Sequence, residues 1–218
     1  MHNLHLPESL HEALTTTTTA GAVGVTRLVI DGLLALDEST ETRIAVATML
    51  YRRLRGYAAL WHIFNAMCGQ APNATLRQIR RDLDESARRT VDAAAAWLSE
   101  RPGGVVHAAD TPIVTAVLAR SDNDNARSAT PTTALAAAEA VGPSAVLAVR
   151  GTRRLTERHP TLVVTTSLAL VPEPVFSTLG APGFEHVPLH RFTAIAVDGE
   201  ILPPEQVGRY AATIGSHK

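Results

Sequence analysis

Apolar positions in the first half of the chain recur every three or four residues, which is typical of helices with one buried face. The clearest case is Asn73–Glu100, where charged side chains fill the other faces. Two shorter apolar stretches precede it and end near Leu36 and Arg55. The pattern predicts that residues 1–100 form a helical N-terminal domain, with Asn73 capping the long helix.

From Gly104 onward, the pattern changes to short apolar runs of the length expected for strands buried on both faces. The predicted strands are Val105–His107, Ala145–Val149, Leu162–Thr166 and Thr193–Val197. The predicted helices, each with proline at its start, are Pro112–Arg120, Pro131–Val141 and Pro204–Thr213. This alternation predicts an α/β protein with a Rossmann-like, mostly parallel sheet over residues 101–218. The polar segment Ser121–Thr130 predicts an exposed loop.

Composition excludes several classes of function. The chain has 218 residues, of which 45% are apolar, so it can bury a sizeable core. The chain has 20 basic and 21 acidic residues, and a formal net charge of -1 does not predict a nucleic-acid binder. No apolar run is long enough for a membrane span, and the single cysteine, Cys68, suits a reducing compartment. We therefore expect a cytoplasmic protein without membrane contact.

Motifs for common cofactors are absent from the sequence. No G-x-G-x-x-G follows a predicted strand, and no G-x-x-x-x-G-K-[ST] occurs. Because the only lysine is Lys218, any bound phosphate must be held by arginines, backbone amides and hydroxyls. His186 and His190 are four residues apart, but Pro188 breaks the helix that would bring them together. We expect neither a cofactor nor a metal ion.

The strand predicted to end at His107 leads directly into a helix that starts around Asp110, Thr111 and Pro112. Helix N-termini bind anions, and in open α/β sheets ligands bind at the carboxyl ends of the strands. His107 and Asp110 are therefore a candidate acid–base pair. The alternative is that Asp110 or Thr111 only caps the helix, while His107 makes local hydrogen bonds.

Three arginines are candidates for holding a phosphate group. Arg150 and Arg153 follow the predicted strand Ala145–Val149, where guanidinium groups can grip a phosphate with two hydrogen bonds each. Arg55 ends the second predicted helix. The alternatives are a solvated loop for the first two and a favourable interaction with the negative helix end for the third.

Four parts of the sequence resemble one protein family. They are Thr19–Ala22 with the apolar helix after it, Arg55–Met67, Val105–His107, and Phe184–Pro188 with Thr193–Glu205. The family contains the alpha, beta and delta subunits of eukaryotic translation initiation factor 2B, ribose-1,5-bisphosphate isomerase and methylthioribose-1-phosphate isomerase. The resemblance implies a helical domain joined to a Rossmann-like domain, with a sugar-phosphate pocket between them. It also implies a homodimer, or a heterodimer with a related subunit, formed through the C-terminal domain.

The resemblance further implies which residues line the pocket. Arg55 matches a phosphate-binding arginine, Gly21 lies in the early glycine-alanine motif, and His107 matches a site-lining histidine. Ala108 stands where the isomerases have a cysteine that takes part in the chemistry, and no counterpart of their glycine-alanine-aspartate motif is found. We therefore expect binding of a phosphorylated sugar or nucleotide metabolite without that chemistry. The alternative is an active sugar-phosphate isomerase that uses Asp110 and His107, alone or with a partner subunit.

Overall fold

The computed structural model describes residues 6–15, 20–121 and 130–215. The first helices are α1 (Glu8–Thr15), α2 (Gly21–Ala35), α3 (Thr40–Arg53), α4 (Ala59–Met67) and α5 (Pro72–Ser99). The strands are β1 (Gly104–His107), β2 (Pro131–Val141), β3 (Ala145–Val149), β4 (Thr161–Thr165), β5 (Phe184–Pro188), β6 (Ala194–Val197) and β7 (Glu200–Leu202). Between and after them lie α6 (Pro112–Arg120), α7 (Thr152–Thr156), η3 (Ser167–Ala169), α8 (Glu173–Phe176), η4 (Leu189–Arg191) and α9 (Pro204–Thr213).

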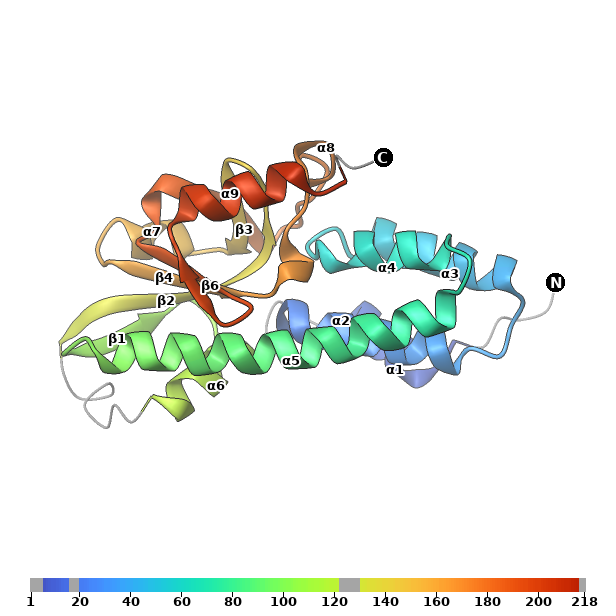
Figure 1. The fold of residues 1–218 in the computed structure, drawn as a ribbon, viewed down its shortest axis with the longest axis horizontal. Helices are drawn as coiled ribbons and strands as arrows, with labels where there is room; N and C mark the ends of the chain where they lie inside the picture. Colours follow the sequence, from blue (N-terminus) through green and yellow to red (C-terminus); the bar gives the residue numbers. More distant parts are fainter. Residues whose placement is uncertain (1–5, 16–19, 122–129, 216–218) are drawn as a thin grey trace.

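The long helix α5 runs along both parts of the molecule (Figure 1). Near its start, Leu76 packs into a core with the other N-terminal helices. Further along, Leu83 and Trp97 pack into a second core that contains side chains of β2, β4 and β6. The helix α9 covers the opposite face of the sheet, where Val207 and Ala211 are buried. No helix in the described parts of the chain is long and apolar enough to cross a bilayer.

The start of α5 corrects one prediction. Pro72 occupies the first turn and Ala71 the N-cap position, and no side chain caps the helix. Asn73 instead accepts a hydrogen bond of 2.5 Å from the guanidinium of Arg43 on α3. Proline has a fixed φ suited to a first helical turn and lacks the N–H that a cap would satisfy. The side chain of Asn73 is therefore available to join two helices.

The strands of the described residues form a mixed sheet in the order β5-β3-β2-β4-β6-β7, with β1 also paired to β2. The pairs β1–β2, β2–β4 and β4–β6 are parallel, whereas β3 and β7 each run antiparallel to their neighbours. An N-terminal helical region and a mostly parallel sheet were predicted, and both are confirmed. The predicted loop Ser121–Thr130 lies almost entirely outside the described residues.

The prediction of a helix over Pro131–Val141 is wrong, because this segment is the central strand β2. Its residues from Thr133 to Val141 are all buried. Alanine favours helices locally, but small side chains also suit a strand enclosed by helices on both faces of a sheet. Here the pairing with three other strands outweighs the local preference.

The strand β2 changes partner along its length. Its first part pairs with β1, where His107 lies opposite Leu135. Its last part pairs with β3, where Ala138 lies opposite Ala148. The register shifts between Ala138 and Ala140, so Glu139 is the extra residue of a β-bulge. Bulges redirect side chains and are common next to functional sites.

Gly208 permits the close packing of α9. A Cβ atom at this position would lie 2.5 Å from the carbonyl oxygen of Pro143 and 2.7 Å from the Cδ1 of Leu189. Because the backbone carbonyl cannot rotate away, Gly208→Ala should lower the free energy of unfolding by about 2 kcal/mol. Urea denaturation measures this change. The control is Gly24→Ala in α2, where the nearest atom is 3.7 Å away, so added helix propensity should make that variant slightly more stable.

Candidate functional site

Glu139 is a carboxylic acid enclosed in the sheet. Its side chain is fully buried, and neither carboxyl oxygen has a hydrogen-bond partner among the described residues. Burial raises the pKa of Glu139 to about 8, and the N–H of Ala22 opposes this shift without reaching hydrogen-bond geometry. The carboxyl group is therefore mostly protonated at neutral pH. Its own carbonyl oxygen accepts a hydrogen bond of 3.1 Å from the N–H of Ala58, just before α4.

The N-termini of α2 and α6 meet beside this carboxyl group. Gly21, the first residue of α2, has a φ of +61°, and a Cβ atom there would lie 3.2 Å from the Cβ of Thr111. The same Cβ would lie 3.9 Å from the Oε1 of Glu139. Glycine is thus required at position 21 both for the backbone conformation and for the close approach of the two helices.

Thr111 occupies the N-cap position of α6, but its hydroxyl makes no capping hydrogen bond. The residue is 1% exposed, and its Oγ1 has no hydrogen-bond partner among the described residues. The alternative of a simple Thr111 cap is therefore wrong. Buried polar atoms without partners are uncommon in native proteins, and here two such residues, Thr111 and Glu139, adjoin one helix start.

A small cavity lies at this point, at the carboxyl ends of β2 and β4. It is lined by Ala20–Val23 at the start of α2, Thr111–Ile113 at the start of α6, Ala137 and Ala138 of β2, and Val164–Thr166 at the end of β4. Its volume is about 10 Å³, which is about the space of one water molecule. The cavity therefore combines free backbone N–H groups with polar side chains in a nearly closed space.

Two further polar residues, Tyr57 and Asp198, can be compared with Glu139. Tyr57 is buried edge-on against Phe184, and burial together with the Glu139 carboxyl keeps the pKa of Tyr57 well above its ordinary value. Asp198 follows β6, but its carboxylate accepts hydrogen bonds from the side chain of Ser86 and from the N–H of Ser167. Glu139 therefore differs from Asp198 because its oxygens are not committed to structural hydrogen bonds.

His107 and Asp110 lie close to each other but not in this cavity. The Nε2 of His107 is 3.5 Å from the Oδ1 of Asp110, whose side chain is 82% exposed. The Nδ1 of His107 is buried without a hydrogen-bond partner among the described residues. His107 pairs with Leu135, four residues before Glu139, which places it about 13 Å away along the strand.

The candidate arginines are also separate from Glu139. Arg55 is exposed and lines another cavity of about 350 Å³ together with Arg52. Arg150 and Arg153 follow β3, which runs antiparallel to β2, so they do not lie at the carboxyl end of β2. The guanidinium of Arg153 donates a hydrogen bond of 2.6 Å to the carbonyl oxygen of His186. The structure therefore does not bring the predicted phosphate ligands and Glu139 into one cavity.

Sequence reasoning missed Glu139 because it assigned this residue to a helix over Pro131–Val141. Two signals were available. Glu139 is the only charged residue between Pro131 and Val141, and it follows two small residues, Ala137 and Ala138. That triplet ends in an acid, as the glycine-alanine-aspartate motif of the isomerases does. No group of three or more histidine, cysteine, aspartate or glutamate side chains that could hold a metal ion occurs in the described parts of the chain.

Comparisons with known proteins bear on the fold. No family model and no curated protein matches the sequence. The structure resembles translation initiation factor eIF-2B from Pyrococcus horikoshii OT3, with a TM-score of 0.73 and 13% identity over 92% of this chain and 99% of that chain.

Two further solved structures have the same architecture. In the tetrameric eIF2B-beta2-delta2 complex from C. thermophilum, the TM-score is 0.65 at 10% identity, over 96% of this chain and 93% of the other. For 5-methylthioribose 1-phosphate isomerase from Pyrococcus horikoshii OT3, it is 0.54 at 13% identity, over 95% and 87%. The chain therefore has the fold shared by eIF2B subunits and methylthioribose-1-phosphate isomerase, as its sequence resemblance implies.

Proposed function

We propose that this chain is a diverged relative of these proteins that binds a phosphorylated sugar or nucleotide metabolite beside Glu139. The observation that carries the proposal is a fully buried carboxyl group beside two helix N-termini, whose oxygens have no hydrogen-bond partner in the part of the chain that the structure describes. Helix N-termini attract phosphate groups through free N–H groups and the positive end of the helix dipole.

Protonation of Glu139 makes such binding feasible. An ionised carboxylate would repel a phosphate group, whereas the neutral acid donates a hydrogen bond to a ligand oxygen. Its pKa of about 8 favours the neutral form at pH 7. The hydroxyl of Thr111, which has no partner among the described residues, supplies a second hydrogen-bonding group, and this residue lines the cavity. Both groups gain a partner when a polar ligand enters.

The small volume of the cavity sets a condition on binding. A space of about 10 Å³ does not admit a ribose ring, so the first turns of α2 and α6 must separate. A ligand that requires such opening binds more slowly than one that enters a preformed pocket.

A thermal-shift screen tests the proposal, followed by calorimetric titration. The probes are ribose 5-phosphate and AMP, with inorganic phosphate and ribose as references. A ligand at a hundredfold excess over its Kd adds about 2.7 kcal/mol to the stability of the folded state.

Thr111→Val should weaken binding about tenfold because the hydroxyl is lost. Thr115 is exposed on the same helix, so Thr115→Val should leave binding unchanged. Absence of a shift with both phosphorylated probes would contradict the proposal, as would unchanged binding in Thr111→Val.

One observation favours an alternative function, that of an active sugar-phosphate isomerase. A carboxyl group whose pKa lies near the working pH is suited to general acid–base catalysis, and Glu139 has such a pKa. The isomerase would then use Glu139 in place of the family's aspartate, although Ala108 cannot replace the cysteine. Turnover of a ribose phosphate that is lost in Glu139→Gln would support this alternative. Turnover that survives in Glu139→Gln but is lost in Asp110→Asn would assign the chemistry to the His107–Asp110 pair.

We also propose that the chain acts as a homodimer or as a heterodimer with a related subunit. The support is the shared fold, since the beta and delta subunits of eIF2B from C. thermophilum form a tetrameric complex. Light scattering coupled to gel filtration distinguishes a dimer from a monomer of 23.2 kDa.

A further inference from the structure

A second, much larger cavity lies away from Glu139. Its volume is about 830 Å³, which is within the range of small-molecule sites. It is bounded by α4, the turn between β2 and β3, the start of α8 and the end of α9, and it shares no lining residue with the small cavity beside Glu139. Among the residues that line it are Trp61, Asn65, Cys68 and Glu173.

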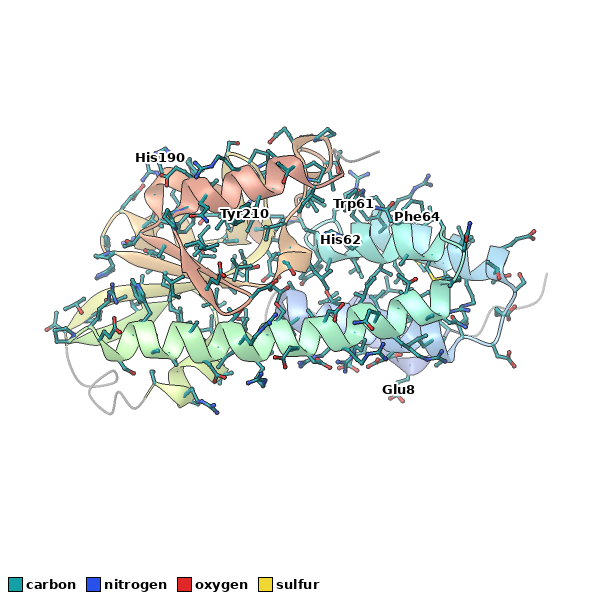
Figure 2. All side chains as sticks on the ribbon, in the orientation of Figure 1. Glu8, Trp61, His62, Phe64, His190 and Tyr210 are labelled. Atoms are coloured by element: carbon teal, nitrogen blue, oxygen red, sulfur yellow. The ribbon has the colours of Figure 1, made fainter. Side chains whose placement is uncertain are left out.

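Trp61 forms one wall of this cavity. The residue is half-buried on α4, where the helix approaches the C-terminal end of α9 (Figure 2). A Cβ atom on Gly215 would lie 4.0 Å from its Cη2. The indole and the ring of His62 pack in a T-shaped arrangement, at 4.8 Å between centroids and 76° between planes. The indole therefore presents an aromatic surface to a cavity bounded on other sides by Pro143 and Pro172.

The charges around the cavity favour a positive ligand. Glu173 is the only charged side chain among the lining residues, it is exposed, and it has no ion pair within the described chain. Burial lowers the pKa of the neighbouring His62, whose Nε2 lies 3.1 Å from the carbonyl oxygen of Leu170, so His62 adds no positive charge at neutral pH. A neighbouring cavity, which shares Pro143 with this one, is lined by Arg209. Glu205 lines the same neighbouring cavity, so the two charges there are opposite.

We propose that this cavity binds a small organic cation, such as a quaternary ammonium compound. A cation is attracted to the face of an indole ring and to a carboxylate at the same time. Trp61 and Glu173 supply these two groups from different elements of the fold. Asn65 adds an amide that has no described side-chain hydrogen bond. This site is independent of the proposed metabolite site.

The single cysteine of the chain makes the site directly measurable. Cys68 is exposed and lines the cavity, so a bound ligand should shield its thiol. The neutral reagent methyl methanethiosulfonate modifies the thiol, and mass spectrometry follows the rate on the whole chain. We expect saturating choline to slow modification at least fivefold. The uncharged isostere 3,3-dimethylbutan-1-ol should slow it less than twofold.

Matched variants separate charge from shape. Glu173→Gln should raise the concentration of choline needed for half-protection about tenfold, and Trp61→Leu should abolish protection. Glu205→Gln, a carboxylate lost from the neighbouring cavity, should behave as the unmodified chain does. Equal protection by the alcohol, or unchanged choline protection in Glu173→Gln, would overturn the proposal. Because Glu173 is exposed, its variant is expected to fold, and an unchanged melting temperature verifies this.

Discussion

Replacing Glu139 with glutamine should remove a pH dependence that otherwise lowers the stability of this protein as the pH rises. Burial raises the pKa of Glu139 from 4.5 to about 8, so between these values the folded state holds a proton that the unfolded state has released. The stabilising effect is complete below pH 4.5 and is lost progressively up to about pH 8. The loss is about 1.4 kcal/mol per pH unit within this window, and on the order of 5 kcal/mol over all of it.

Urea denaturation of both proteins at pH 5, 6, 7 and 8 measures this effect. The difference between the two stability curves isolates Glu139, because His62, whose lowered pKa gives the opposite slope near pH 6, is common to both. At pH 8, Glu139→Gln should be the more stable protein. Glu157→Gln on the surface serves as the control and should follow the unmodified chain. A constant difference between the Glu139→Gln and unmodified curves would show that Glu139 does not titrate in this range.

Loss of Arg43 should destabilise the helical part of the molecule by about 3 kcal/mol. Arg43 is 8% exposed, and its guanidinium donates hydrogen bonds to the carbonyl oxygen of Leu33 at 2.8 Å and to the Oδ1 of Asn73 at 2.5 Å. One side chain thus joins the end of α2 to the start of α5. In Arg43→Met, the carbonyl oxygen of Leu33 would lose its partner in a buried position, and the exposed Asn73 would no longer be held against α3.

Chemical denaturation of Arg43→Met, compared with Arg53→Met, measures this contribution. Arg53 lies on the same helix but is exposed and has no ion pair in the described chain, so its replacement should change the stability by less than 0.5 kcal/mol. Equal stability of the two variants would mean that the Arg43 hydrogen bonds contribute little beyond what water provides.

The sequence predicts most of the helices and four of the strands, because each is specified by its own pattern. It does not predict β2. Residues Ala134–Ala138 carry neither β-branched nor aromatic side chains, and alanine alone favours a helix. Only the pairing with β1, β3 and β4 makes this segment a strand, and that pairing involves residues distant in sequence.

The candidate site was harder to predict for the same reason. His107 and Asp110 are three residues apart in sequence, and the Nε2 of His107 lies 3.5 Å from the Oδ1 of Asp110. The expectation for Arg150 and Arg153 assumed that the preceding strand runs parallel to its neighbours, and local sequence does not specify strand direction. Glu139 was missed because its burial depends on the whole sheet. Its role, like that of His107 and Asp110, stays a prediction until the variants are measured.

The helix α5 has a consequence for how the molecule unfolds. With Leu76 it completes one hydrophobic core, and with Leu83 and Trp97 it completes the other. If either the helical part or the sheet unfolds, apolar side chains of α5 become exposed. The other part also packs against α5, so it loses stability as well. Although the chain is arranged as helices followed by a sheet, the first core also contains Ala140 and Leu147 of the sheet, so we expect the two halves to unfold as one cooperative unit.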